Sequence, residues 1–480
     1  MSSRPPVTHQ SPPAGLGRRS LLKALGGTAL AGGAVAAAAP AAASVRADNV
    51  VADVIVIGAG YAGGTAAREL SAQGLNVAVV EARDRIGGRI WTDTFAGKRI
   101  ELGGGWLSPD HHLVAAEFSR YGLTNAADVI PTTSVMPGAN GGFDRLLPQD
   151  ANAHLGELFD QFFAGSETYF ERPNDPRYRS DLLAQLDLLS FTDRINQLGL
   201  SDVDATWLHG YFAAYTGGDN TSRAMTSMAQ WWALGGWNIE GWEKQTAFKP
   251  TAGMTKLLQK MLDASPRAKV YLNSPVTAVT STSSGVQVRV GSNRLFTGRA
   301  AVLATPVNTW KKISFNPGLP AVHAAATSEG VGVGLATKLW IHLAGDVEAV
   351  YAMGTKSSAL PLMIPQEALS GGGRLMIGFA GSSLNVSDAT AVQKAVREYI
   401  PGATVVGYRA HEWGRDPYAL GGWGLRRPGQ LLRQLPGIQQ PHGRIAFAGG
   451  DIASGWNGAF VEGAVETGLR AAQQVAALIN

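Results

Sequence analysis

The sequence predicts an α/β fold in which a Rossmann-like dinucleotide-binding domain is interleaved with a second, α+β domain. A strand, a glycine-rich turn and a helix follow one another over residues 53–70, and a second apolar strand, 75–80, ends at Glu81. The chain has 480 residues, more than one core usually serves. Apolar residues make up 45% and charged residues 16%, which is typical of a well-packed globular protein.

The glycine turn carries the pattern G-x-G-x-x-G at Gly58, Gly60 and Gly63. The first glycine permits the turn, the second lets backbone approach a pyrophosphate, and the third lets the helix pack on the sheet. Tyr61 and Ala62 open the helix, whose N-terminus carries a partial positive charge. These residues are therefore predicted to bind the phosphates of a dinucleotide, and Glu81 its ribose hydroxyls.

The stretch after Glu81, EARDRIGGRIWT, resembles flavin amine oxidases and their relatives. The resemblance favours FAD over NAD and implies a glutathione reductase-type FAD-binding domain beside the substrate domain of the amine oxidase fold. It implies that Gly87, Gly88 and Arg89 meet the FAD phosphates. The stretch ELGGGW continues it. The further cofactor-binding residues that it implies here are Ala82, Arg83, Gly103, Gly104, Gly105 and Trp106.

The resemblance covers nearly the whole chain. Ser274-Pro-Val-Thr is similar to a family strand, and Val276 is expected to meet adenine. Phe447-Ala-Gly-Gly-Asp resembles the family's C-terminal FAG-x-E stretch, with Asp451 in place of glutamate. It implies flavin contacts for Gly450, Asp451, Ala459 and Phe460. Residues 461–479 have helical apolar spacing, so a helix should begin at the flavin.

The motifs divide the chain into interleaved parts. The FAD-binding domain is predicted to comprise 48–130, 250–310 and 440–480, and the substrate-binding domain 131–249 and 311–439. Helices are expected within 151–230, with Ser180 as a possible N-cap, and a strand is expected to open at Lys338. Four tryptophans lie between Met225 and Trp242. Most of them are expected to pack in the core and one or two to line substrate access.

Three residues are assigned to the chemistry by the resemblance. Trp423 and Phe460 match two aromatic rings that stand roughly perpendicular to the flavin ring and guide the amine between them. Lys338 matches a lysine that holds a water at flavin N5. Burial should lower the pKa of Lys338. Gly421 and Gly422 are expected to let backbone lie against the flavin. Gly422 occupies the position of a flavin-attaching cysteine in some members, so non-covalent FAD is expected.

Several stretches resemble exported bacterial nicotine oxidoreductases and pseudooxynicotine amine oxidases in particular, for example Asp193 to Ser201 and Gly235-Gly-Trp-Asn. Those enzymes have asparagine at the second cage position. Phe460 therefore favours small primary or secondary amines over nicotine, with a polyamine also open. The expected reaction is hydride transfer from the amine to flavin N5, followed by hydrolysis of the imine. The alternatives are a carbon–carbon desaturase, which would need a long apolar tunnel, and a redox-neutral or non-catalytic flavoprotein.

The first 47 residues resemble a twin-arginine signal peptide, with Arg18-Arg19 followed by Ser-Leu-Leu-Lys. Export by the Tat pathway to the periplasm or beyond is expected, without stable membrane insertion and with a mature start near Asp48. Oxygen or a cytochrome c-like carrier would accept the electrons. The sequence does not determine the oligomeric state, and a homodimer is compatible with it.

The net charge of +4 belongs to the same leader segment, because residues 1–47 hold five basic side chains and no acidic one. Without them 36 basic residues face 37 acidic ones, which gives no support for a nucleic-acid partner. The sequence has no cysteine, and this excludes disulfides, thiolate metal sites and cysteine catalysis. The histidines show no metal-ligand spacing, so no metal site is predicted.

Overall fold

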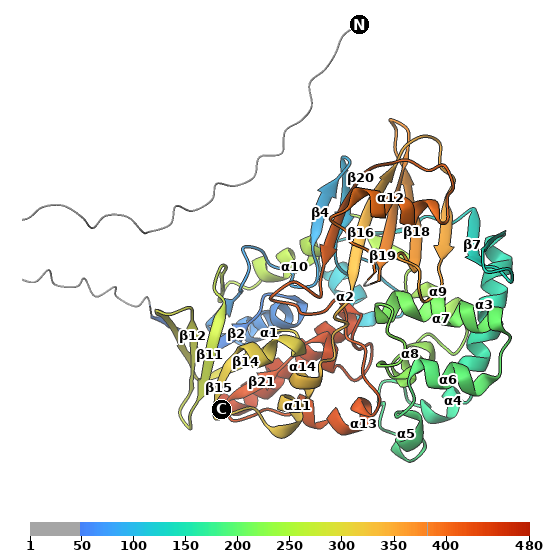
Figure 1. Ribbon diagram of the computed structural model, residues 1–480. Helices are drawn as coiled ribbons and strands as arrows, with labels where there is room; N and C mark the ends of the chain where they lie inside the picture. Colours follow the sequence, from blue (N-terminus) through green and yellow to red (C-terminus); the bar gives the residue numbers. More distant parts are fainter. Residues whose placement is uncertain (1–48, 382) are drawn as a thin grey trace, which may run out of the picture. The chain divides into compact units, whose positions relative to one another are not determined.

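The two strands predicted around the glycine turn lie in a five-stranded parallel sheet (Figure 1). The computed structural model describes residues 49–381 and 383–480, so the predicted signal peptide lies outside the described residues. The sheet has the order β10–β3–β2–β14–β21, with the strands Ala268–Tyr271, Val77–Val80, Val54–Ile57, Ala300–Leu303 and Ile445–Phe447. Parallel pairing places the carboxyl ends of these strands at one edge, where ligands of such sheets bind.

Two predicted helices, α1 (Tyr61–Ala72) and α14 (Val461–Ile479), cover one face of this sheet. They pack closely against each other, since a Cβ on Gly468 would stand 2.5 Å from the Ala62 carbonyl oxygen. Helix α10 (Met254–Asp263) also packs against α1. The predictions of a helix after the glycine turn and of a C-terminal helix are confirmed.

The opposite face of the parallel sheet packs against a second sheet, and both contribute to one apolar core. The order of the second sheet is β1–β13–β12–β11–β15. Its strands are Val50–Val51, Arg294–Gly298, Val286–Val290, Val276–Ser281 and Ser314–Asn316. Val276 therefore opens a strand, as predicted.

A seven-stranded, mostly antiparallel sheet supplies the other side of the functional region, in the order β20–β16–β19–β18–β17–β7–β8. Its strands are Val405–Glu412, Thr337–Leu343, Arg374–Ala380, Leu362–Ala368, Val350–Met353, Thr133–Pro137 and Phe143–Leu146. Alternation along β16 sends Leu339 and Ile341 to the face covered by α12 (Ala389–Arg397). Lys338 and Trp340 are thereby turned to the opposite face.

The region from 148 to 244 is helical, as predicted (Figure 1, green). The helices are α3 (Pro148–Phe162), α4 (Ser166–Tyr169), α5 (Ser180–Leu186), α6 (Phe191–Leu198), α7 (Asp202–Thr216), α8 (Met225–Leu234) and α9 (Ile239–Lys244). The predicted cap at Ser180 is wrong, because Ser180 is the first residue of α5 and its hydroxyl donates to the Arg177 carbonyl. Ser190 instead caps α6, with Asp193 completing a capping box.

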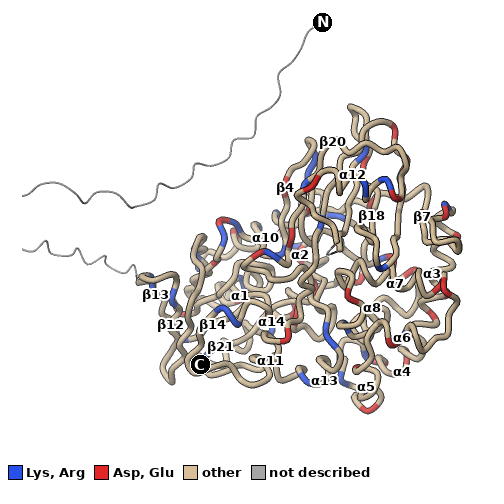
Figure 2. The backbone as a smooth tube through the Cα atoms, viewed as in Figure 1, with Lys and Arg blue, Asp and Glu red and all other residues tan. Residues whose placement is uncertain are grey.

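Short elements connect these layers. They are β4 (Thr92–Phe95), β5 (Lys98–Glu101), α2 (His112–Arg120), β6 (Asn125–Ala127), β9 (Phe248–Pro250), η1 (Val307–Lys312), α11 (Ala321–Glu329), α13 (Gln430–Gln434), η2 (Gly437–Gln439) and η3 (Gly450–Ile452). Basic and acidic residues are interspersed along the described chain (Figure 2). None of the described helices combines the length and apolar character needed to cross a membrane.

Candidate active site

A cavity of about 400 Å³ extends from the carboxyl edge of the parallel sheet to the seven-stranded sheet. Most of the predicted site residues meet in its wall, although they come from distant parts of the chain. Those that line it are Gly58, Gly60, Tyr61, Ala62, Glu81, Ala82, Arg83, Gly87, Gly88, Arg89, Gly103, Gly104, Gly105, Trp106, Val276, Lys338, Trp423, Gly450, Ala459 and Phe460. Of the predicted residues, Gly63 and Asp451 lie behind this wall.

The glycine turn has the geometry that its pattern predicts. Gly58 has φ +105°, a conformation that side-chain-bearing residues rarely adopt. A Cβ on Gly63 would lie 1.9 Å from the Gly58 carbonyl oxygen, so this glycine serves helix packing and not cavity lining. Gly60 precedes α1 without any side-chain cap. The first N–H groups of α1, which have no intrahelical acceptor, are therefore free to bind an anion.

Glu81 directly follows β3, and backbone N–H groups hold its carboxylate in place. One oxygen accepts from the Ala59 N–H at 2.8 Å and the other from the Arg83 N–H at 3.0 Å. The residue as a whole is 3% exposed. These bonds fix the carboxylate beside the glycine turn, at the position where the sequence predicts ribose binding.

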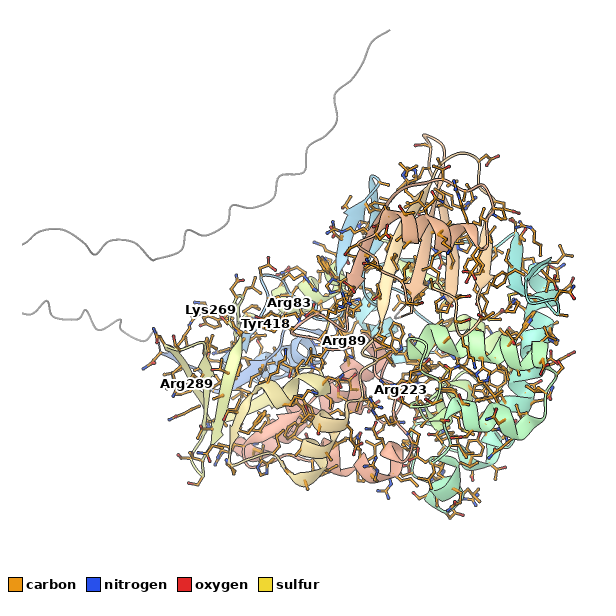
Figure 3. All side chains as sticks on the ribbon, in the orientation of Figure 1. Arg83, Arg89, Arg223, Lys269, Arg289 and Tyr418 are labelled. Atoms are coloured by element: carbon orange, nitrogen blue, oxygen red, sulfur yellow. The ribbon has the colours of Figure 1, made fainter. Side chains whose placement is uncertain are left out.

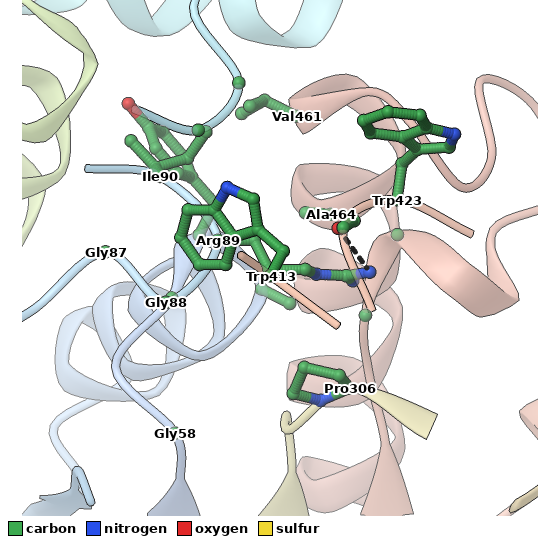
Figure 4. A pocket seen from close by; sticks show the side chains of 18 of the residues that line it. Gly58, Gly87, Gly88, Arg89, Ile90, Pro306, Trp413, Trp423, Val461 and Ala464 are labelled. Carbon is green, nitrogen blue, oxygen red and sulfur yellow. Dashed lines mark hydrogen bonds between the residues drawn. The ribbon is translucent and has the colours of Figure 1, made fainter. Parts of the chain in front are cut away.

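Arg89 links the second glycine turn to the segment that carries Trp423. Its guanidinium, labelled in Figure 4, donates to Asp451 at 2.8 Å and to the Gly422 carbonyl at 3.3 Å. Asp451 also accepts from the Val307 N–H at 3.2 Å. Asp451 does not line the cavity, and its carboxylate orients Arg89, while the cofactor contact expected for Asp451 stays a prediction.

The segment that precedes Trp423 closes the dinucleotide end. Asp416 pairs with Arg83 at 2.6 Å, and Tyr418 stands with its ring 5.4 Å from the same guanidinium (Figure 3). Pro417 and Tyr418 both line the cavity. The chain before Trp423 therefore also covers the cofactor end.

The dinucleotide end fits FAD in its chemistry. The uncapped N-terminus of α1, the Arg83 and Arg89 side chains and the glycine turns supply donors and close backbone approach for a pyrophosphate. A second helix N-terminus, at Val461 of α14, also lines the cavity. The acid in its first turn, Glu462, is engaged elsewhere, accepting from two N–H groups of α2 at 2.7 and 2.8 Å.

Lys338 lies at the opposite end of the cavity and is 4% exposed. Its Nζ donates to the Gly103 carbonyl at 2.9 Å and stands 4.3 Å from the centre of the Trp106 ring. Burial, and next the like charge of Lys249, lower the pKa of Lys338 to about 7. The direction of this shift agrees with the prediction.

The two predicted cage rings are held by different neighbours. Trp423 donates from Nε1 to the Tyr215 carbonyl at 2.7 Å and meets Phe379 edge-on at 5.9 Å. Phe460 packs edge-on against Trp231 at 5.1 Å and against His111 at 5.1 Å.

Each ring is therefore immobilised before any substrate binds. Burial lowers the pKa of His111 to about 3, so the wall behind Phe460 is uncharged.

The glycines before Trp423 correct one expectation. A Cβ on Gly421 would lie 2.9 Å from the Gly332 carbonyl carbon, and one on Gly422 would lie 2.5 Å from the Ala336 Cβ. Both glycines are thus required by packing on the 332–336 segment. Gly421 does not line the cavity at all, whereas Gly422 does.

Sequence reasoning missed the apolar residues that complete the chamber around Trp423. They come from α7, α8, β18, β19 and the end of β20, and are Tyr215, Trp231, Leu362, Ile364, Phe379 and Trp413. The tryptophan-rich window was the only signal. Of its four tryptophans only Trp231 lines the cavity, while Trp232 and Trp242 pack in the core, which agrees with the expected division. Across the described residues, no cluster of His, Asp or Glu side chains could hold a metal ion.

This combination of a parallel sheet with a glycine-turn anion site and a chamber beside a buried lysine defines a dinucleotide-dependent oxidoreductase. The chain belongs to the family of flavin-containing amine oxidoreductases, whose profile matches residues 61–476. It is a flavin-dependent amine oxidoreductase, and FAD is its cofactor.

Individual relatives agree with this assignment. The chain is 33% identical over 430 residues to nicotine dehydrogenase of Pseudomonas putida, covering 88% of each chain. It is 30% identical over 435 residues to pseudooxynicotine dehydrogenase of a Pseudomonas species, covering 88% of this chain and 86% of that one. The structure of putrescine oxidase bound to putrescine matches with TM-score 0.75 and 25% identity, over 89% of this chain and 100% of the other.

Proposed function

We propose that this enzyme oxidises a primary or secondary amine that has one strongly basic nitrogen and an apolar, ring-sized body, such as cyclohexylamine or pseudooxynicotine, and that it does not act on polyamines. The proposal rests on the chamber between Trp423 and Phe460, where the neighbouring wall is largely apolar or aromatic and its polar side chains, Gln245 and Thr246, are uncharged. Glu81 is the one acidic residue in the described cavity wall, and it lies at the dinucleotide end with its oxygens engaged. A second ammonium group would have no carboxylate to offset its desolvation.

The residues of the chamber position the amine and exclude water. Trp423 and Phe460 confine the substrate from two sides, and Phe379 supports the first of these rings. The apolar surroundings favour the neutral amine, which is the reactive form. FAD, when bound, would supply the acceptor for a hydride from the carbon beside the amine nitrogen, and the resulting imine would be hydrolysed. Lys338, held on the Gly103 carbonyl, supplies a group that holds or moves a proton at the inner end of the chamber.

Anaerobic mixing with a panel of amines tests the proposal directly. Nicotine, pseudooxynicotine, cyclohexylamine and benzylamine are compared with putrescine and spermidine while the visible absorbance of the flavin is followed. Bleaching by one or more of the monoamines, without bleaching by putrescine or spermidine, is expected. Faster bleaching by the polyamines would overturn the substrate assignment.

The flavin is proposed to be bound non-covalently, because residue 422 is glycine and the chain has no cysteine. Acid precipitation of the holoenzyme should release all of the FAD into the supernatant and leave a colourless pellet. A pellet that stays yellow after washing would contradict this prediction.

Export is proposed from the twin-arginine pattern in residues 1–47. A reporter fused to this segment should reach the periplasm, and the double variant Arg18→Lys, Arg19→Lys should remain in the cytoplasm. Export of the double variant at the same level would remove the Tat assignment.

For an exported enzyme a cytochrome c-like carrier is the proposed electron acceptor, and the names of two dehydrogenase relatives support it. Faster flavin reoxidation by cytochrome c than by air is expected.

A further inference from the structure

A partly buried ion pair lies directly behind the inner wall of the cavity. Lys249 on β9 has its Nζ 2.9 Å from an oxygen of Asp128 and also donates to the Gln366 side chain. The two charged residues are adjacent because β6 and β9 pair, with the Asp128 N–H donating to the Ala247 carbonyl at 3.0 Å. Neither Lys249 nor Asp128 lines the cavity.

The indole of Trp106 connects this pair to Lys338. Its Nε1 donates to the second oxygen of Asp128 at 2.6 Å. The Nζ atoms of Lys338 and Lys249 stand 4.3 and 4.9 Å from the centre of its ring. Asp128 thus orients the ring on which the Lys338 amine rests, and it also anchors the second ammonium.

The electrostatic effect of the pair on Lys338 follows from the same arrangement. The like charge of Lys249 lowers the pKa of Lys338, second only to burial, while Glu101 and Asp128 raise it. The remaining ionisable neighbours are engaged elsewhere. His411, which pairs with Lys338 across β20 and β16, is hydrogen-bonded to Asp416 at 3.1 Å. The negative charge of Glu367 raises the pKa of Lys249.

We propose that Lys249 and Asp128 form a positioning pair that acts on Lys338 through the shared indole of Trp106. The pair fixes where the Lys338 amine lies, and the positive charge of Lys249 disfavours a second ammonium beside it. The inference deepens the proposed function, since it takes Lys338 to act at the flavin. It does not depend on which amine is oxidised.

A pH titration of the visible absorbance of the bound flavin tests the proposal without any amine substrate. The wild-type holoenzyme should show a transition with its midpoint near the Lys338 pKa of about 7, and Lys338→Met should lack it. In Lys249→Met, which keeps the apolar stem and removes the charge, the midpoint should rise by about one pH unit or more. A midpoint that stays within about 0.3 units of the wild type would overturn the proposal.

Two further variants separate charge from packing. Lys249→Arg keeps the positive charge, so its midpoint should stay close to that of the wild type, and a shift as large as that of Lys249→Met would overturn the proposal. Lys269→Met is the matched control, because Lys269 also lies over an aromatic ring, Tyr271, at 5.2 Å but far from the chamber (Figure 3). The pH titration uses no amine substrate. A wrong substrate assignment would therefore show in the amine panel alone, and a wrong positioning pair would show in the pH titration alone.

Discussion

Lys338→Met is expected to slow flavin reduction by amine or flavin reoxidation by about 100-fold, the lower range of what a positioned proton-handling group contributes. Methionine keeps the volume of the side chain but loses the amine that the Gly103 carbonyl holds at 2.9 Å. The pKa of Lys338 is lowered to about 7, so its neutral form grows as pH rises through 7. The step that uses neutral Lys338 should therefore accelerate across this range in the wild type and lose that dependence in the variant.

Stopped-flow measurement of both half-reactions between pH 5.5 and 9.5 checks this expectation, with Lys269→Met as the control. The control should match the wild type, since Lys269 lies at the edge strand β10. Unchanged rates in both half-reactions of Lys338→Met would remove this lysine from the mechanism. If the rates of Lys338→Met are lowered equally at every pH, the lysine contributes through packing and not by handling a proton.

Gly63→Ala is expected to weaken FAD binding by about 100-fold or more, which corresponds to roughly 3 kcal/mol. The new Cβ would stand 1.9 Å from the Gly58 carbonyl oxygen and 3.1 Å from Val56 Cγ1. Backbone cannot yield as a flexible side chain does, so α1 must move away from the glycine turn. The N–H groups that face the phosphates move with it.

Flavin content from the visible absorbance, together with a titration of the apoenzyme with FAD, measures this effect. Gly371→Ala is a suitable control, because a Cβ at Gly371 meets no atom within 4 Å. Full FAD occupancy and wild-type affinity in Gly63→Ala would show that the helix does not need this close approach. Circular dichroism establishes that the variant is folded when its affinity is measured.

Local motifs made the dinucleotide end predictable. The turn at Gly58, the acid at Glu81 and the second glycine turn at Gly87 each depend on residues that are neighbours in the sequence, and the backbone conformations that the two turns require favour glycine. The resemblance to known flavoproteins added Lys338 and Trp423, and both line the cavity. Hence much of the candidate site could be assigned from the amino-acid sequence alone.

Residues whose position depends on distant packing could not be assigned. Phe379 and Ile364 lie on antiparallel strands that read as ordinary core strands, and only the pairing order of the seven-stranded sheet turns them toward the chamber. Gly421 was expected at the flavin because glycine suits close approach, but its neighbour is the backbone of Gly332. A sequence indicates that a close approach occurs and does not reveal what approaches.

The sequence by itself determined the fold class and the FAD-binding motifs, because each depends on local backbone chemistry or on a motif that keeps its spacing, and the resemblance predicted the two cage residues. Only the tertiary structure decided that Asp451 serves Arg89, that Asp416 covers the dinucleotide end, and that Lys249 and Asp128 stand behind Lys338. Charges interact through space, and residues 128, 249 and 338 are far apart along the chain. Their coupling exists only once β6, β9 and β16 are folded together.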